Sequence, residues 1–208
     1  MENYNPVITF LRERLATPLF IEVHRLAPYP PPRPGAPPRG TEVGVVHDLM
    51  IHDLDLVLDL VGDQVQTIDA VGTSVLSPSE DIANVRLHFN SGCIANITAS
   101  RISPERMRKI RVFQENAYYS LDYERQSGEI FSLTPQGIIR EPVPIREQNA
   151  LACELDAFLK AVLEFRETKR VPPIGVSGER GLQALELADA IVHQINERLS
   201  SRLAAKNS

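Results

Sequence analysis

Asp48, His52 and Asp55 are polar residues spaced four and three apart in a segment that is otherwise largely apolar. The segment, GVVHDLMIHDLDLVLDLVG, runs from Gly44 to Gly62. Residues at i, i+4 and i+7 share one face of an α-helix, so we expect the three side chains to form a line. Such a line could be an acid–base centre, part of a metal site, or the polar edge of an ordinary amphipathic helix.

Proton transfer is one chemistry that this spacing allows. A carboxylate at Asp48, one turn from His52, can fix the tautomer and orientation of the imidazole, which exchanges a proton near neutral pH. The oxidation of an alcohol needs such a group, because the hydroxyl proton must be removed as the hydride leaves carbon. On this hypothesis Asp48 and His52 are the catalytic residues. The segment holds nothing that could accept the hydride.

Two other interpretations of the same residues stay open. In the first, Asp48 lies in the first helical turn, where a negative charge suits the helix dipole, and His52 is a paired surface residue. In the second, His47, His52 and an aspartate bind a divalent metal. The two histidines are five apart, which places them on different faces of a regular helix. No cysteine or further histidine cluster supports a metal, so we predict none.

The elements that would position these residues begin with a short helix that Asn5 caps. A strand, PLFIEVHRL, follows, and then a proline-rich stretch at residues 28–38. Because proline lacks a backbone donor, we expect a surface loop there, although a polyproline ligand for another protein is the alternative. The candidate segment is predicted to be helical from about Val45 to Leu60 and to end at Gly62.

Apolar and polar residues alternate in the next part of the chain, which is typical of strands. Turn signals separate the segments VQTIDAVGTSV, DIANVRLHF, CIANITASRI, RKIRVFQE, AYYSLDYE and GEIFSLT. Together with the earlier strand they predict an α+β fold: an open-faced, largely antiparallel six- to seven-strand sheet with helices on one face. Ile110, Val112 and Phe113 place apolar side chains on both faces of one strand, which suggests that the second face is covered in an oligomer.

Two helices are predicted to close the chain. The first carries an apolar stripe of Leu151, Leu155, Phe158, Leu159 and Val162. Ser177 is expected to cap the second. We expect a junction helix at residues 1–16, a single domain at 17–199 and a frayed tail at 200–208.

Composition limits the classes of function. The chain has 208 residues and a net charge of −5, which argues against nucleic acid as a partner. Cys93 and Cys153 are far apart in the sequence and are expected to be reduced thiols. No apolar run is long enough for a membrane span or a signal peptide, so we expect a cytoplasmic protein.

The segment Gly44–Gly62 resembles the Gly-x-x-x-Asp-x-x-x-His-x-x-Asp helix of the Gfo/Idh/MocA family of NAD(P)-dependent oxidoreductases. YNPVITFLRERL, LFIEVHRL and GVSGERGLQALELADAI are similar to further family segments and occur in the family's order. The resemblance implies a C-terminal domain that binds substrate and forms a homodimer or homotetramer through its sheet face. It implies that His52 exchanges a proton with the substrate hydroxyl and that Asp48 is its partner near the nicotinamide. Asp55 matches the third acidic position, for which we expect a structural role.

The family's N-terminal half has no counterpart in this chain. A Rossmann domain would begin with a strand that leads into Gly-x-Gly-x-x-Gly at a helix N-terminus. The glycines at 175, 178 and 181 follow Pro172-Pro173 instead, and the family's Glu-Lys-Pro motif is absent. We therefore expect NAD or NADP to bind mainly to the missing domain, and neither NAD binding nor turnover by this chain alone.

The sequence thus predicts the substrate-binding and oligomerisation half of a dehydrogenase that oxidises a hydroxyl of a sugar, cyclitol or nucleotide sugar. Arg25, Arg33 and Arg39 could bind an anionic, small-molecule substrate, because guanidinium groups suit phosphates. They could equally be solvated loop charges. The alternative function is a noncatalytic dimerising or scaffold module with the same fold.

Overall fold

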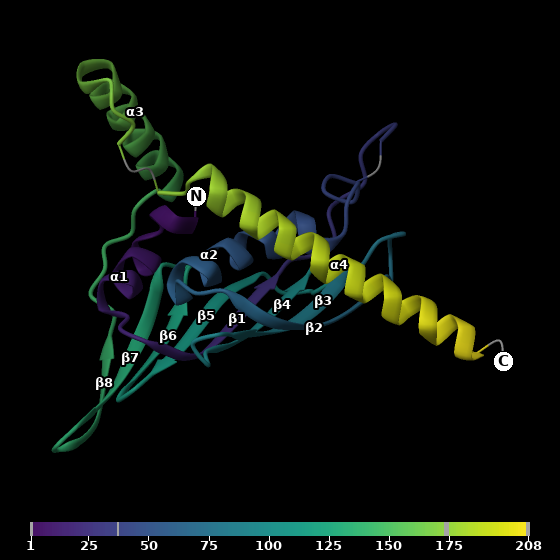
Figure 1. The fold of residues 1–208 in the computed structure, drawn as a ribbon, viewed down its shortest axis with the longest axis horizontal. Helices are drawn as coiled ribbons and strands as arrows, with labels where there is room; N and C mark the ends of the chain where they lie inside the picture. Colours follow the sequence, from purple (N-terminus) through teal and green to yellow (C-terminus); the bar gives the residue numbers. More distant parts are fainter. Residues whose placement is uncertain (1, 37, 173–174, 207–208) are drawn as a thin grey trace.

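An eight-stranded sheet forms the centre of the protein (Figure 1). The structure is a computed structural model that describes residues 2–36, 38–172 and 175–206. The strand order is β2-β3-β4-β1-β5-β6-β7-β8, and every neighbouring pair is antiparallel except β1 and β4. The strands are β1 (Pro18–Leu26), β2 (Val65–Thr73), β3 (Ile82–Phe89), β4 (Ile94–Ser100), β5 (Met107–Gln114), β6 (Ala117–Asp122), β7 (Ser127–Thr134) and β8 (Gly137–Pro142).

The predicted α+β fold with an open-faced, largely antiparallel sheet is confirmed, with one strand more than the six or seven expected. The additional strand, β8, forms a hairpin with β7 at the sheet edge, and all of its residues are exposed. Since neither face of β8 is buried, its sequence carries no alternation of buried and exposed residues. This is why the pattern did not reveal it.

Strand β1 lies in the middle of the sheet between β4 and β5. Val23 is level with Ile97 on β4 and with Ile110 on β5. All three side chains are fully buried and belong to the core on the helical side of the sheet. The first strand of the chain is therefore the one around which the sheet is assembled.

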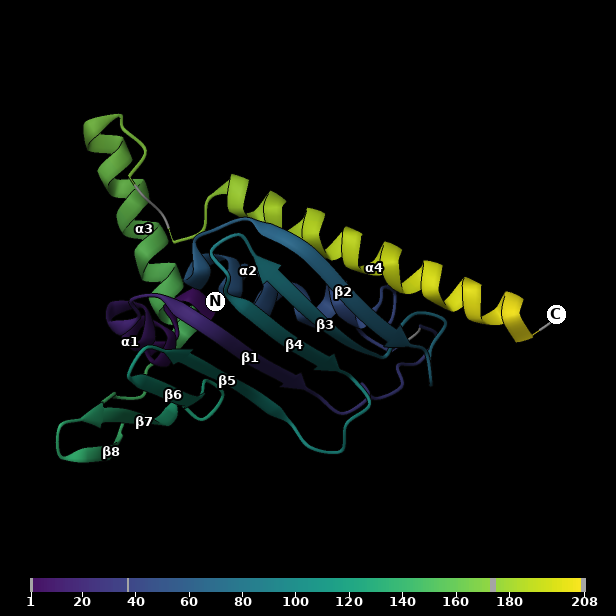
Figure 2. The ribbon, with the colours of Figure 1, turned by 60° about the horizontal axis from the view of Figure 1, so that its bottom comes forward.

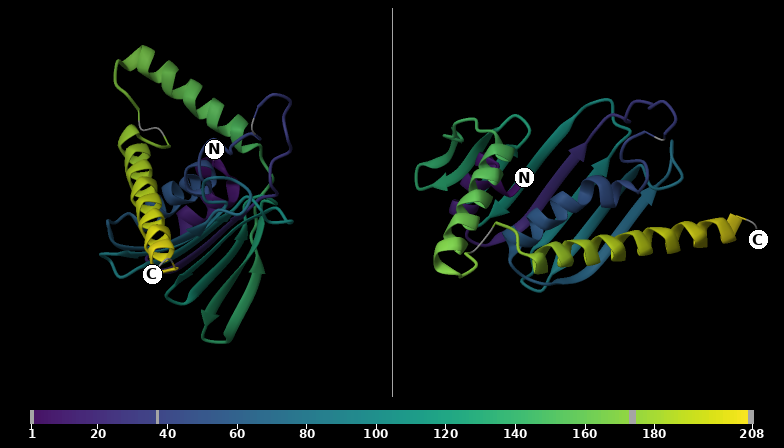
Figure 3. Two further views of the ribbon diagram at one scale, coloured as in Figure 1. Left: turned by 90° about the vertical axis from the view of Figure 1, so that its right-hand side faces the viewer. Right: turned by 90° about the horizontal axis from the view of Figure 1, so that it is seen from above.

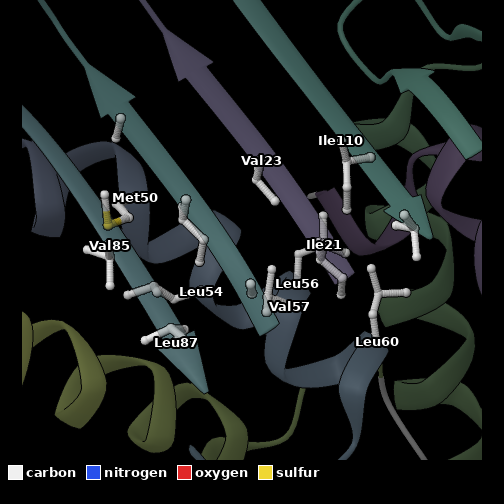
Figure 4. Close-up of a cluster of buried hydrophobic side chains, with 14 of the residues drawn as sticks. Ile21, Val23, Met50, Leu54, Leu56, Val57, Leu60, Val85, Leu87 and Ile110 are labelled. Carbon is white, nitrogen blue, oxygen red and sulfur yellow. The ribbon is translucent and has the colours of Figure 1, made fainter. Parts of the chain in front are cut away.

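Helices cover one face of the sheet, as predicted (Figure 3). The four helices are α1 (Pro6–Arg14), α2 (Ile51–Val61), α3 (Ala150–Thr168) and α4 (Gly178–Lys206), of which α1, α2 and α4 contact the sheet. Helix α2 lies over β1 and β4, and α4 lies against β2 and α2. In Figure 4, Leu54, Leu56 and Val57 of α2 point into the same cluster as side chains of the strands. No helix in the described part of the chain is long and apolar enough to cross a membrane.

Three predicted helix ends are confirmed. The side chain of Asn5 accepts a hydrogen bond from Val7 N–H (3.0 Å), and Pro6 occupies the first turn of α1. Gly62 ends α2 with φ of 63°, a conformation that glycine adopts without strain. Ser177 Oγ accepts from Arg180 N–H (3.3 Å) at the start of α4. Helix α4 continues to Lys206, past Leu199, where we expected the tail to begin.

The apolar stripe of α3 is not packed against the sheet, contrary to what its amphipathic pattern led us to expect. The helix projects away from the domain in Figures 1 and 3, and none of its residues is buried. Phe158 is 58% exposed, and the other stripe residues are also exposed. A pattern of period 3.6 shows that a helix has an apolar face but does not show which element covers it. Within the described residues, no helix or strand covers the apolar face of α3.

We predict that core and stripe substitutions will differ in their effect on stability. Leu54→Ala should lower the free energy of unfolding by about 2–5 kcal/mol, because it leaves a cavity under α2. Phe158→Ser should change it by less than about 0.5 kcal/mol, the usual range for a surface position. Urea unfolding followed by circular dichroism measures both. A large loss from Phe158→Ser would show that the stripe is covered in solution.

Candidate active site

Asp48 and His52 lie where the chain enters α2. The segment Val46–Met50 is a π-helical turn, in which Ile51 N–H bonds to the carbonyl of Val46, and α2 continues from it. A regular α-helix was predicted here, whereas the i→i+5 bond makes a wider turn. Such turns occur often at functional sites. Asp48 lies in the π turn and His52 in the first turn of α2.

The other aspartates of this segment are all engaged in ion pairs. Asp53 is bound by Arg25, Asp55 by Arg180, and Asp59 by Arg12 and Arg180. Asp55 also accepts a hydrogen bond from Asn3 (2.7 Å), in keeping with the structural role expected for it. The three polar residues predicted to form a line therefore differ in their contacts. Asp55 joins α2 to α4, whereas Asp48 and His52 are left over.

The side chains of Asp48 and His52 have no hydrogen-bond partner among the described residues, and no bond joins them to each other. They are near enough for the charge of His52 to lower the pKa of Asp48. The Asp48 side chain is half-buried, and this burial raises its pKa above the ordinary value in spite of Arg101 and His52. Solvent still reaches the carboxylate, and a carboxyl group with a raised pKa at an accessible position is a candidate functional group.

His52 exposes part of its imidazole to solvent, and neighbouring protein atoms remove water from the remainder. This desolvation lowers its pKa, and the positive charge of Arg25 lowers it further, against the opposing charges of Asp53 and Glu2. The ring is therefore held in its neutral form near pH 7. A neutral imidazole can accept a proton from a hydroxyl group.

A buried network beneath His52 fixes α2 on the central strand. Arg25 of β1 donates from Nε to Asp53 Oδ2 (2.8 Å) and from Nη2 to Asp53 Oδ1 (2.9 Å). Tyr123 donates its hydroxyl proton to the same Oδ1 (2.7 Å), and Glu2 accepts from Arg25 Nη2 (3.0 Å). Asp53 is adjacent to His52 in the sequence, so this network sets the position of the His52 backbone. Sequence reasoning missed Asp53 and Tyr123, because nothing in the local pattern shows which aspartate is buried.

The three arginines predicted to contact substrate lie in different environments. Arg25 is only 3% exposed and is committed to Asp53. Arg33 pairs with Glu42 (3.0 Å) within the proline-rich loop. Arg39 is exposed, and it precedes Gly40, whose Cα lies against the Asp48 carboxylate. Of the three, Arg39 is the one that directly precedes a residue lying against Asp48.

The metal hypothesis finds no cluster to support it. His47 lies apart from His52 and bonds to Asp189 of α4 (2.7 Å). Across the residues with described positions, no group of three or more His, Cys, Asp or Glu could hold a metal ion. Both cysteines are free thiols.

Comparison with known proteins gives a consistent family. A family model described as the GFO/IDH/MocA C-terminal domain matches residues 12–120, which contain Asp48 and His52. UDP-N-acetylglucosamine 3-dehydrogenase of Acidithiobacillus ferrooxidans is 33% identical over 196 residues, which cover 88% of this chain and 58% of that enzyme. Inositol 2-dehydrogenase of Rhizobium meliloti is 28% identical over 172 residues, covering 77% and 50%.

Solved structures agree with these relatives. The structure of UDP-N-acetylglucosamine 3-dehydrogenase from Acidithiobacillus ferrooxidans superimposes with a TM-score of 0.80 and 30% identity, over 93% of this chain and 59% of that one. The chain thus spans between half and three fifths of the length of these relatives.

The environment of His52 makes a pH-dependent prediction. Its imidazole should titrate below the ordinary value of about 6.5, because partial desolvation and Arg25 both disfavour the protonated form. Histidine ring signals followed by NMR against pH measure the midpoint, and His52→Gln identifies the signal. A midpoint at or above the ordinary value would contradict the electrostatic description of the site.

Proposed function

The chain belongs to the GFO/IDH/MocA family, and we propose that it is the substrate-binding part of an NAD(P)-dependent dehydrogenase in which His52 and Asp48 handle the proton of a sugar hydroxyl. One observation carries this proposal. On a segment whose other aspartates are all engaged in ion pairs, only the family's Asp-x-x-x-His pair is left without hydrogen bonds among the described residues. Both side chains are therefore open to a hydrogen bond from a bound ligand.

The proposed proton step follows from the electrostatics. Neutral His52 accepts the proton of the substrate hydroxyl as the carbon–oxygen double bond forms, and in the reverse reaction it returns that proton. Asp48 stabilises the positive charge that develops on the imidazole. The positive charge of Arg25 disfavours the protonated form of His52, so the imidazole is neutral before it accepts the proton.

We propose that the pyrophosphate of the nicotinamide cofactor is bound mainly by elements other than the described residues. Gly178 and Gly181 begin α4, and no strand leads into them, so they do not form a strand–loop–helix that could hold a pyrophosphate. NAD or NADP would accept the hydride in the complete enzyme, and its binding elements would lie outside these residues. Relatives that are considerably longer than this chain are consistent with that division.

A nucleotide sugar is the substrate class that we favour over a free polyol. The relative with the higher identity is named for a UDP-sugar, whereas an inositol dehydrogenase is 28% identical. Arg39, exposed beside the loop that touches Asp48, could bind a diphosphate while the sugar hydroxyl reaches His52. A cyclitol would have no use for that charge.

The open face of the sheet supports the proposed oligomer (Figure 2). Aromatic rings on four neighbouring strands follow one another across it, with centroid distances of 5.7, 4.4 and 5.2 Å between Phe20, Phe113, Tyr118 and Phe131. Aromatic side chains are enriched in the buried parts of protein interfaces. We propose that a second copy covers this face. A noncatalytic dimerising module would use the same surface, and turnover by the completed protein distinguishes the two functions.

Ligand binding tests the substrate class directly. UDP-N-acetylglucosamine should raise the melting temperature of this chain, because a ligand that binds only the folded form stabilises it by mass action. Arg39→Ala should reduce that shift, whereas Arg140→Ala, on the distant β8 hairpin, should leave it unchanged. Stabilisation by myo-inositol, but not by the UDP-sugar, would overturn the nucleotide-sugar assignment.

Turnover tests the proton step in the enzyme completed by a dinucleotide-binding domain. His52→Ala should lower kcat by roughly 10²-fold or more, the usual scale for the loss of a general acid–base group. Asp48→Asn should lower it less and shift its pH dependence. His193→Ala, on the exposed side of α4, serves as the control. Near-normal kcat for His52→Ala would reject its role as the general acid–base group, whereas no turnover by the completed but otherwise unchanged protein would favour the noncatalytic module.

A further inference from the structure

Arg101, directly after β4, is a fully satisfied buried cation. Its side chain is 2% exposed. It donates from Nε to Asp81 (2.9 Å), from Nη1 to the carbonyls of Gly40 (2.7 Å) and Val43 (2.7 Å), and from Nη2 to the hydroxyls of Ser77 (2.8 Å) and Ser79 (2.9 Å). These contacts use all five N–H groups of the guanidinium.

Asp81 anchors this arginine in the loop between β2 and β3. It is fully buried and accepts further hydrogen bonds from the backbone of Val75, Leu76 and Ser77. Burial alone would raise the pKa of Asp81. Its hydrogen bonds, including that from Arg101, hold the pKa far below the usual range instead. Arg101 is therefore fixed from one side, and its remaining donors can hold a second segment.

The second segment held by Arg101, which contains Gly40 and Val43, lies against Asp48. Gly40 has φ of 82°, and a Cβ atom at this position would lie 2.7 Å from Asp48 Oδ2 and 3.1 Å from Oδ1. The backbone of Gly40 thus forms a wall against the carboxylate. Its carbonyl is one of the two that Arg101 binds. A continuous set of contacts leads from Asp81 through Arg101 and Gly40 to the carboxylate of Asp48.

We propose that Arg101 is a positioning residue for the Asp48–His52 pair: it holds the loop of Gly40 and Val43 so that the backbone of Gly40 confines the Asp48 carboxylate beside His52. An effect of Arg101 on catalysis would depend on the proposed dehydrogenase function. Its effect on the position of the Asp48 carboxylate does not depend on that function. The hydrogen bonds of Arg101 go to Asp81, Gly40, Val43, Ser77 and Ser79 and not to His52. The charged groups that act on Asp48 are Arg101, His52 and Glu42.

A purely structural role for Arg101 makes a different prediction. If the arginine only ties two loops together, weakening it lowers the stability of the domain but leaves the environment of Asp48 in the folded protein as it was. If it confines the carboxylate, weakening it lets water reach Asp48. The titration of Asp48 separates these cases, because partial burial is what raises its pKa.

The loop offers a matched pair of variants for the test. Gly40 and Gly35 both have positive φ, but a Cβ atom at Gly35 would meet nothing within 4 Å. Gly40→Ala should push the carboxylate out of its confined position and lower the midpoint of Asp48 toward the ordinary value for aspartate. Gly35→Ala, which also places alanine at a positive φ, should leave the midpoint unchanged. Carboxyl carbon NMR of this chain against pH measures both.

Arg101→Lys completes the test, because lysine keeps the charge and loses the fork that holds two carbonyls. It should also lower the Asp48 midpoint. If Gly40→Ala and Arg101→Lys both fold and titrate as the unchanged protein does, the proposal is wrong. If Arg101→Lys does not fold, the comparison of Gly40→Ala with Gly35→Ala decides alone. The measurement needs neither substrate nor cofactor, so its failure is distinct from failure of the proposed dehydrogenase function.

Discussion

The buried ion pair between Arg25 and Asp53 is the interaction on which the arrangement of the site depends. It joins α2 to the strand in the middle of the sheet, and the hydroxyl of Tyr123 completes it from the far side. Removing one member of a buried pair leaves an uncompensated charge in the interior and is strongly destabilising. Since His52 directly precedes Asp53, this pair also positions the backbone from which the imidazole projects.

A second buried arginine, Arg101, supports the surroundings of Asp48 much as Arg25 supports those of His52. Arg101 is held by Asp81 and reaches the loop that lies on Asp48. In both cases a cation is satisfied by groups far from it in the sequence, and the neighbouring candidate side chain is left without a hydrogen bond. The buried ion pairs of the fold thus involve residues next to the candidate site, whereas the side chains of Asp48 and His52 take part in none among the described residues.

Much of the fold was predictable because its elements carry local signals. Asn5 and Gly62 mark helix ends by their own chemistry, and alternation located seven of the eight strands. The π turn that contains Asp48 and the exposed strand β8 have no such signal. The apolar stripe on α3 was predicted but its exposure was not, because the residues of an apolar face do not show which other element, if any, packs against it.

The sequence by itself determined the family, the fold class and the choice of Asp48 and His52, since these depend on residue types at fixed spacings along one segment. Only the tertiary structure decided that Arg25 is a buried support rather than a free cation, and that Asp53 and Asp55 are committed to ion pairs. The partners involved lie between 28 and 125 residues away. Whether a polar group is satisfied depends on such distant neighbours, and no local pattern contains them.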